Sequence, residues 1–203
     1  QHFMTDQGVL QRMISYASVD KNDVVLEIGA GFGFLSGLLA PRCKKVIAVE
    51  IDSKLVGILR KELRNLQNVE LVEGDVLTAD IPSFNKVVST PPYSISSPLL
   101  FWLLEKSFDT AVLTFQKELA ERLTASVGSK SYGRLTVNTY YRAEVESLDY
   151  VPRTAFYPPP DVDSIIVRLK PKLSPRFQVK NEQMFSDLVQ MLFTQRNRKV
   201  RNA

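Results

Sequence analysis

The sequence has 203 residues, of which 44% are hydrophobic and 24% charged, with a net charge of +4. This length suits one α/β domain with a small appendage, and the mildly basic balance is compatible with a nucleic-acid partner. The single Cys43 excludes an internal disulfide framework. No apolar run approaches the roughly 18 residues needed to cross a membrane. We therefore expect a cytoplasmic protein with no membrane contact and no metal site. Because the chain begins with Gln1, we also expect its natural start to be missing.

Strand and helix patterns alternate through the first part of the chain. An expected helix at 8–18 precedes a strand at 24–28, and a helix at 34–40 ends before Pro41. The alternation continues with expected strands at 45–50, 69–72, 86–89 and 110–115 and expected helices at 52–65, 97–106 and 117–124. This order predicts a doubly wound α/β sheet.

The pattern changes after a polar loop at 127–133. A short helix from 135 is followed by two β-rich segments at 143–151 and 163–170, which predict an antiparallel addition at the sheet edge. A linker is expected at 172–175 and an amphipathic helix at 181–200. Since one such helix cannot form a core, we expect a catalytic domain over 1–173 and the start of an incomplete, truncated C-terminal helical domain over 174–203.

Glycines at every second position join the first strand to the next helix. Gly29, Gly31 and Gly33 let the chain turn sharply with its backbone bare, as a ligand cradle requires. The dinucleotide fingerprint needs glycine at the position of Phe34, so NAD is disfavoured. The spacing Glu-x-Gly-x-Gly-x-Gly instead resembles the first motif of S-adenosylmethionine methyltransferases.

Three acidic residues lie at or near the carboxyl ends of the expected strands. Glu50 stands where doubly wound folds place the acid that binds both ribose hydroxyls, although it could be a solvated loop residue. Asp75 could accept from the cofactor's adenine amine or form a turn. Glu27 could order the glycine turn by accepting its backbone N–H groups, or contact the ligand directly.

Thr-Pro-Pro-Tyr at 90–93 follows the fourth expected strand and resembles the Asn/Asp-Pro-Pro-Tyr motif of amino-methyltransferases. The resemblance implies that the side chain at 90 and the Pro91 carbonyl accept the two hydrogens of the target amine, while Tyr93 stacks on the base. Thr90 departs from the motif because it offers one hydroxyl on a shorter arm. Phe156 could clamp the second face of a flipped adenine or be an ordinary core residue.

Five further segments indicate which methyltransferase family the chain resembles. The chain resembles the small-subunit rRNA adenine N6,N6-dimethyltransferase family at residues 1–6, 93–98, 132–135, 156–164 and 193–199. Its C-terminal sequence looks more archaeal or eukaryotic than bacterial. The resemblance covers the whole chain and implies a Rossmann-like, seven-stranded sheet that binds S-adenosylmethionine. It implies a cofactor site made of His2, Met4, Gly29, Gly31, Glu50, Asp75 and Thr90.

The same resemblance implies the substrate. Family members methylate two adjacent adenosines near the 3′ end of small-subunit rRNA, so we expect a monomer acting on a pre-ribosomal particle. A basic cluster suited to phosphate contact comprises Arg196, Arg198, Lys199 and Arg201, and a second set comprises Lys117, Arg122, Lys130 and Arg134. Two alternatives stay open. One is an RNA-binding assembly factor that methylates poorly because of Thr90, and the other is a large-subunit rRNA methyltransferase of the antibiotic-resistance type.

Overall fold

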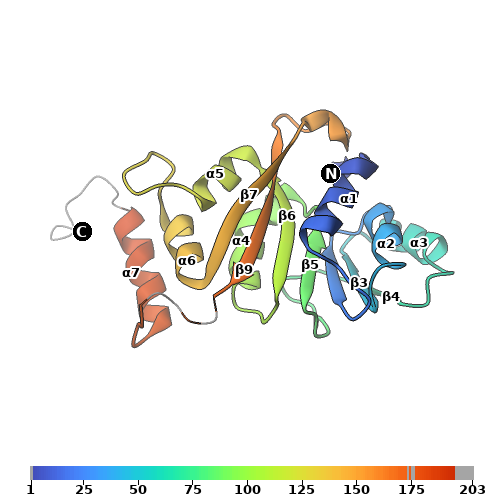
Figure 1. Cartoon of the computed structure of the whole chain (residues 1–203), viewed down its shortest axis with the longest axis horizontal. Coiled ribbons are helices and arrows are strands. Elements are labelled where there is room, and N and C mark those ends of the chain that lie inside the picture. Colours follow the sequence, from blue (N-terminus) through green and yellow to red (C-terminus); the bar gives the residue numbers. More distant parts are fainter. Residues whose placement is uncertain (1, 173, 175–176, 195–203) are drawn as a thin grey trace.

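A seven-stranded sheet forms the centre of the molecule, a computed structural model that describes residues 2–172, 174 and 177–194 (Figure 1). The strand order is β4-β3-β2-β5-β6-β9-β7. The parallel strands are β2 (Val24–Ile28), β3 (Lys45–Glu50), β4 (Val69–Glu73), β5 (Lys86–Ser89) and β6 (Thr110–Gln116). The chain reverses its winding direction between β2 and β5, so the predicted doubly wound sheet is confirmed.

The last two strands of the sheet are antiparallel to their neighbours. β9 (Ser164–Pro171) pairs with β6, and β7 (Ala143–Val151) pairs with β9 at the edge. The predicted antiparallel addition at the sheet edge is therefore confirmed. Its inner strand is buried between two partners, which places the start of β9 beside the carboxyl end of β6.

Helices cover both faces of the sheet. α1 (Gln7–Tyr16), α2 (Phe34–Leu39) and α3 (Ser53–Glu62) pack on one core, while α4 (Ser96–Leu103), α5 (Lys117–Leu123) and α6 (Arg134–Arg142) pack on the other. Asp6 and Asp52 cap α1 and α3 by accepting backbone N–H groups. Several helices end before their predicted limits. In α1 the reason is Ser18, whose φ of 49° cannot continue a helix.

Two short strands were missed by the sequence patterns. β1 (Phe3–Met4) and β8 (Phe156–Tyr157) form a separate antiparallel pair, with Phe3 opposite Tyr157 and Met4 opposite Phe156. A strand of two residues has no measurable period, so alternation could not reveal it. The pair brings the start of the chain to residues more than 150 positions later.

The last described helix is α7 (Glu182–Thr194), which lies next to α6 in Figure 1. Its Phe185 ring lies 5.0 Å from the Tyr141 ring of α6. The part of the expected helix beyond 194 lies outside the described residues, and the domain boundary at 173 stays a prediction. None of the helices within the described residues is both long and apolar enough to cross a membrane.

Candidate cofactor and substrate pocket

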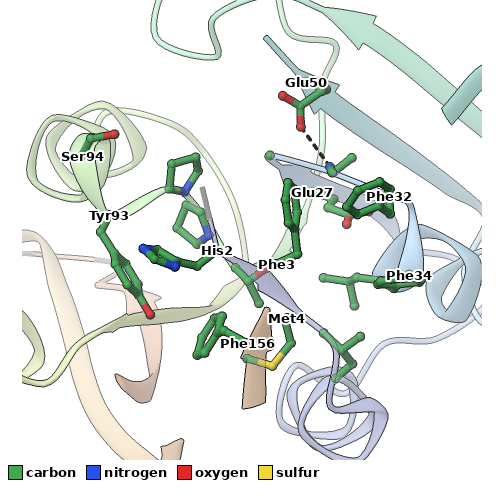
Figure 2. Close-up of a pocket in the computed structure, with 18 of the residues that line it drawn as sticks. His2, Phe3, Met4, Glu27, Phe32, Phe34, Glu50, Tyr93, Ser94 and Phe156 are labelled. Atoms are coloured by element: carbon green, nitrogen blue, oxygen red, sulfur yellow. Dashed lines mark hydrogen bonds between the residues drawn. The ribbon is translucent and has the colours of Figure 1, made fainter. Parts of the chain in front are cut away.

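One pocket of about 370 Å³ lies at the carboxyl ends of the parallel strands (Figure 2). This volume is within the range of small-molecule sites. The predicted site residues that line it are His2, Met4, Gly29, Gly31, Glu50, Thr90, Pro91, Tyr93 and Phe156. The pocket thus unites the glycine turn after β2, the end of β3, the turn after β5 and the β1/β8 pair, which are far apart in the sequence.

The glycine turn needs glycine for two physical reasons. Gly29, Gly31 and Gly33 have φ values of 73°, 58° and 81°, in the left-handed region that other residues rarely adopt. The space is also occupied. A Cβ at Gly31 would lie 2.9 Å from the Phe3 ring, and one at Gly29 would lie 3.0 Å from the Pro92 ring. The turn therefore contacts both the N-terminal strand and the Thr-Pro-Pro-Tyr segment.

Glu50 anchors this turn from the end of β3. Its Oε2 accepts the Gly31 N–H at 2.9 Å, and its Oε1 accepts the N–H groups of Ile51 and Asp52, both at 3.0 Å. The side chain is buried, yet it lines the pocket. Because a carboxylate has about four acceptor positions, capacity remains for a ligand hydroxyl. Glu50 is therefore a buried, hydrogen-bonded residue of the pocket wall, and the alternative of a solvated loop residue is wrong.

The structure contradicts one of the two roles considered for Glu27, that of ordering the glycine turn, whereas direct ligand contact stays a prediction because Glu27 lines the pocket. The N–H groups of Gly29 and Ala30 bond to the Val49 carbonyl, and that of Gly31 bonds to Glu50, so the prediction that Glu27 accepts them is wrong. Glu27 instead accepts the Ser36 hydroxyl. Burial, with a smaller contribution from the nearby Glu50 charge, raises the pKa of the Glu27 carboxyl to about 8. The pocket floor therefore contains a carboxyl group that holds its proton near neutral pH.

Asp75 lies just after β4 and is not among the residues that line the pocket. Its Oδ1 accepts the Leu77 N–H at 3.0 Å, which is the turn geometry considered as the alternative. The carboxylate is only half-buried, so it retains acceptor capacity. Contact with the cofactor's adenine stays a prediction for this residue.

The side of the pocket after β5 carries the predicted substrate residues. The Tyr93 hydroxyl shares a 2.6 Å hydrogen bond with Ser164 Oγ. The Tyr93 and Phe156 rings contact each other edge to face, with centroids 6.1 Å apart and planes at 65°. Phe156 is buried in the core, so in this arrangement it supports the Tyr93 ring. A base clamped between the two rings stays a prediction that would require them to separate.

The N-terminal strand closes the pocket between these two sides. Met4 is buried, and the Phe3 ring lies 4.6 Å from the Phe32 ring of the glycine turn. His2 is exposed, and its Nδ1 donates to the Pro158 carbonyl at 2.7 Å. The Thr5 N–H donates to the Ala155 carbonyl at 2.9 Å. The β1/β8 pair is thus fixed at both ends beside the pocket, where the family resemblance places His2 and Met4 (Figure 2).

The predicted RNA contacts are only partly described by the structure. Arg196, Arg198, Lys199 and Arg201 lie outside the described residues. Lys117, Arg122 and Lys130 are exposed on α5 and the following loop. Arg134 is half-buried with its guanidinium 5.0 Å from the Phe101 ring centroid, so it contributes to packing between α6 and α4.

Several pocket residues were missed by sequence reasoning. Phe3, Phe32 and Phe34 line the cofactor side, and Gln116 lines the far side at the end of β6. Gln116 could have been found, because it ends a parallel strand next to the other strand ends. Ser164, which bonds to Tyr93, gives no such signal because its partner is 71 positions away.

The open α/β sheet has a glycine turn at its topological switch point and an acidic residue at the end of the neighbouring strand. This architecture is typical of enzymes that bind nucleoside cofactors. The Pro-Pro-Tyr turn facing the same pocket defines the narrower class of α/β methyltransferases.

Comparisons with known proteins identify the family. The model of the ribosomal RNA adenine dimethylase family matches residues 1–203. A probable ribosomal RNA small subunit methyltransferase A from Methanosarcina acetivorans is 47% identical over this entire chain and 75% of its own length. The chain therefore belongs to the ribosomal RNA adenine dimethylase family, whose members use S-adenosylmethionine.

Two solved structures support the same assignment. A dimethyladenosine transferase from Plasmodium falciparum has a TM-score of 0.87 at 39% identity, covering 95% of this chain and 71% of its own. The 23S rRNA methyltransferase ErmE has a TM-score of 0.83 at 34% identity, covering 98% of this chain and 81% of its own. The predicted family and the Rossmann-like methyltransferase fold are both confirmed.

Proposed function

We propose that this protein transfers methyl groups from S-adenosylmethionine to the N6 amines of two adjacent adenosines near the 3′ end of small-subunit rRNA. The observation that carries the proposal is that the glycine turn and the Thr-Pro-Pro-Tyr turn face one pocket and touch through Gly29 and Pro92. Small-subunit methyltransferase names among the archaeal relatives support this choice of substrate.

The cofactor side of the pocket fits S-adenosylmethionine. Gly29 and Gly31 present backbone that a Cβ would block, and the remaining acceptor capacity of Glu50 suits a ribose hydroxyl. His2 and Met4 border the same space. When bound, the cofactor supplies an electrophilic methyl group on its sulfonium centre.

The substrate side provides the acceptors for a planar amine. Within the described residues, the Thr90 hydroxyl and the Pro91 carbonyl have no internal hydrogen-bond donor, so both are available to the two N–H groups of adenine. Accepting both hydrogens favours a tetrahedral nitrogen whose lone pair can attack the methyl group. Tyr93 supplies a flat apolar surface for the extruded base. Each adenosine needs two successive transfers.

We place the reaction in the cytoplasm, on a pre-ribosomal particle, with the protein acting as a monomer. We also propose that residues 174–203 belong to a small helical RNA-binding domain whose basic cluster, from Arg196 to Arg201, contacts phosphates. The α7 helix and its aromatic contact with α6 support a helical unit next to the sheet.

Two other functions have specific support. Thr90 weakens one of the two acceptors, which favours an RNA-binding assembly factor with little activity. The likeness to ErmE favours large-subunit rRNA as the substrate. Incubating the protein and cofactor separately with unmethylated small and large subunits, followed by mass spectrometry of the rRNA, distinguishes all three. We expect dimethyladenosine only in the small-subunit rRNA. Its appearance in large-subunit rRNA, or in neither, would contradict the proposal.

A further inference from the structure

The Tyr93 ring, on which the proposed function stacks the target base, is held through its hydroxyl and flanked by two other rings. Its hydroxyl shares the 2.6 Å hydrogen bond with Ser164 Oγ, and the ring centroids of Phe156 and His2 each lie 6.1 Å from its own. Burial raises the pKa of the Tyr93 hydroxyl, so the group stays neutral at physiological pH. Ser164 provides its hydrogen-bond partner from the antiparallel addition to the sheet.

Ser164 is itself fixed more firmly than a loop residue. It is fully buried at the start of β9, between Gln116 of β6 and Val151 of β7. The residue before it, Asp163, accepts the Arg153 N–H through its carboxylate and the Lys117 N–H through its carbonyl. Two consecutive residues therefore tie three neighbouring segments to the substrate side of the pocket.

A further contact strengthens this anchor. The Tyr150 hydroxyl interacts with the Asp163 carboxylate, which lowers the pKa of Asp163 and raises that of Tyr150. The Asp163 carboxylate therefore stays ionised and keeps its donors across the physiological range. The position of the Ser164 backbone follows from these bonds and from the strand ladder.

We propose that Ser164 is a positioning residue for methyl transfer, acting only through Tyr93. The inference rests on the proposed function. A tyrosine ring joined to the chain at one end can tilt about its side-chain bonds, whereas a hydrogen bond at the hydroxyl fixes the other end as well. The fixed ring sets the plane of the stacked adenine and hence the direction of its amine lone pair. A misdirected amine slows the reaction even when the substrate is bound.

The test is a double-mutant cycle on single-turnover methylation of small-subunit particles, with RNA and cofactor both saturating. The variants are Ser164→Ala, Tyr93→Phe and the two combined. Each single variant removes the same hydrogen bond from one side, and we expect each to slow the reaction by about three- to thirtyfold. In the Tyr93→Phe background, Ser164→Ala should change the rate by less than about twofold. Cofactor affinity should change by less than about twofold in all three.

Ser96→Ala is the matched control, because Ser96 is a buried serine whose hydroxyl has no hydrogen-bond partner among the described residues. It should leave the rate unchanged. Wild-type speed in Ser164→Ala would overturn the inference. So would an equal slowing in the Tyr93→Phe background, or a parallel loss of cofactor affinity, since either indicates general disruption. An inactive wild-type protein would instead refute the proposed function, and with it the inference.

Discussion

At the residue scale, position 90 decides how well the target amine is held. The amine has two N–H donors and the Pro91 carbonyl can take one, so the other depends on the Thr90 hydroxyl. That hydroxyl lies on a shorter arm than an asparagine oxygen. Thr90 lines the pocket and is half-buried, so a donor that fails to reach it is shielded from water. An unmet buried donor costs about 1–3 kcal/mol.

We expect Thr90→Asn to speed single-turnover methylation by about ten- to a hundredfold, because about 1.4 kcal/mol corresponds to a factor of ten in rate. Cofactor affinity should change much less, since the other predicted cofactor contacts lie on other strands. Both quantities are measured on the wild type and the variant with small-subunit particles. A variant that is no faster would show that the hydroxyl is a competent acceptor.

Glu50 accepts backbone N–H groups and is proposed to bind the cofactor. A substitution at this position can be compared with the loss of an exposed carboxylate elsewhere. Replacing Glu50 with glutamine turns one acceptor atom into a donor facing either the Gly31 N–H or the N–H groups of Ile51 and Asp52. We expect Glu50→Gln to weaken cofactor binding by about ten- to a hundredfold in calorimetric titration. The control is Glu73→Gln at the end of the neighbouring strand β4, where the carboxylate is exposed and pairs with Arg60. Equal affinity in wild type and Glu50→Gln would contradict the assignment.

Glu27 makes stability depend on pH. Its pKa is raised by burial from 4.5 to about 8, so between these values the unfolded chain has lost a proton that the folded protein keeps. The stabilisation is complete below the unfolded pKa and is lost as pH rises towards 8. The free energy of unfolding therefore falls with pH in this range, by at most about 1.4 kcal/mol per pH unit for one proton.

Glu27→Gln removes this proton, so the variant should lose less stability than the wild type between pH 5 and pH 8. Urea unfolding at several pH values measures the difference. Parallel pH dependences in the two proteins would show that Glu27 is already ionised in the folded state.

At the element scale, the glycine turn is a local motif, but the space available at its glycines depends on a strand distant in sequence. Gly31 combines a left-handed φ with a 2.9 Å approach of the Phe3 ring from β1. Gly37 lies in α2, and nothing lies within 4 Å of a Cβ built there. Replacing each of these two glycines with alanine therefore compares a crowded, left-handed position with an open helical one.

We expect Gly31→Ala to displace β1 or the turn and to lower cofactor affinity at least about tenfold, with a loss of stability. Gly37→Ala should raise stability by about 0.5–1 kcal/mol, since alanine is the better helix former, and should leave binding unchanged. Thermal unfolding and calorimetric titration of both variants provide the comparison. Normal binding by Gly31→Ala would show that the strand yields without affecting the pocket.

At the scale of the whole molecule, charge governs the proposed encounter with RNA. Each phosphate neutralised by a lysine or arginine steepens the salt dependence of binding. Replacing Arg196 and Arg198 together with glutamine should flatten the slope of log affinity against log salt concentration by about one to two units. The control pair, Lys44→Gln with Lys61→Gln, removes two exposed cations near the β4 edge of the sheet. Equal slopes for both pairs would place the RNA surface elsewhere.

The alternation of strands and helices, the glycine turn, and the placement of Glu50 and Thr90 at strand ends were all predictable from the amino-acid order. These features are local, because hydrophobic period and strand-end position are written in neighbouring residues. The antiparallel addition was also predictable from its two β-rich segments. The family resemblance added His2 and Met4, which no local pattern would have placed beside the pocket.

Which of these residues meet, and how their polar groups are shared, depends on the packing of the folded chain. It paired β1 with β8, gave the Gly31 N–H to Glu50 in place of Glu27, and set the Phe156 and Tyr93 rings in an edge-to-face arrangement. It also joined Tyr93 to Ser164 across 71 positions of sequence. Each outcome depends on competition among groups that are distant in the chain, and burial determines which partner is available. A sequence pattern contains no information on that competition.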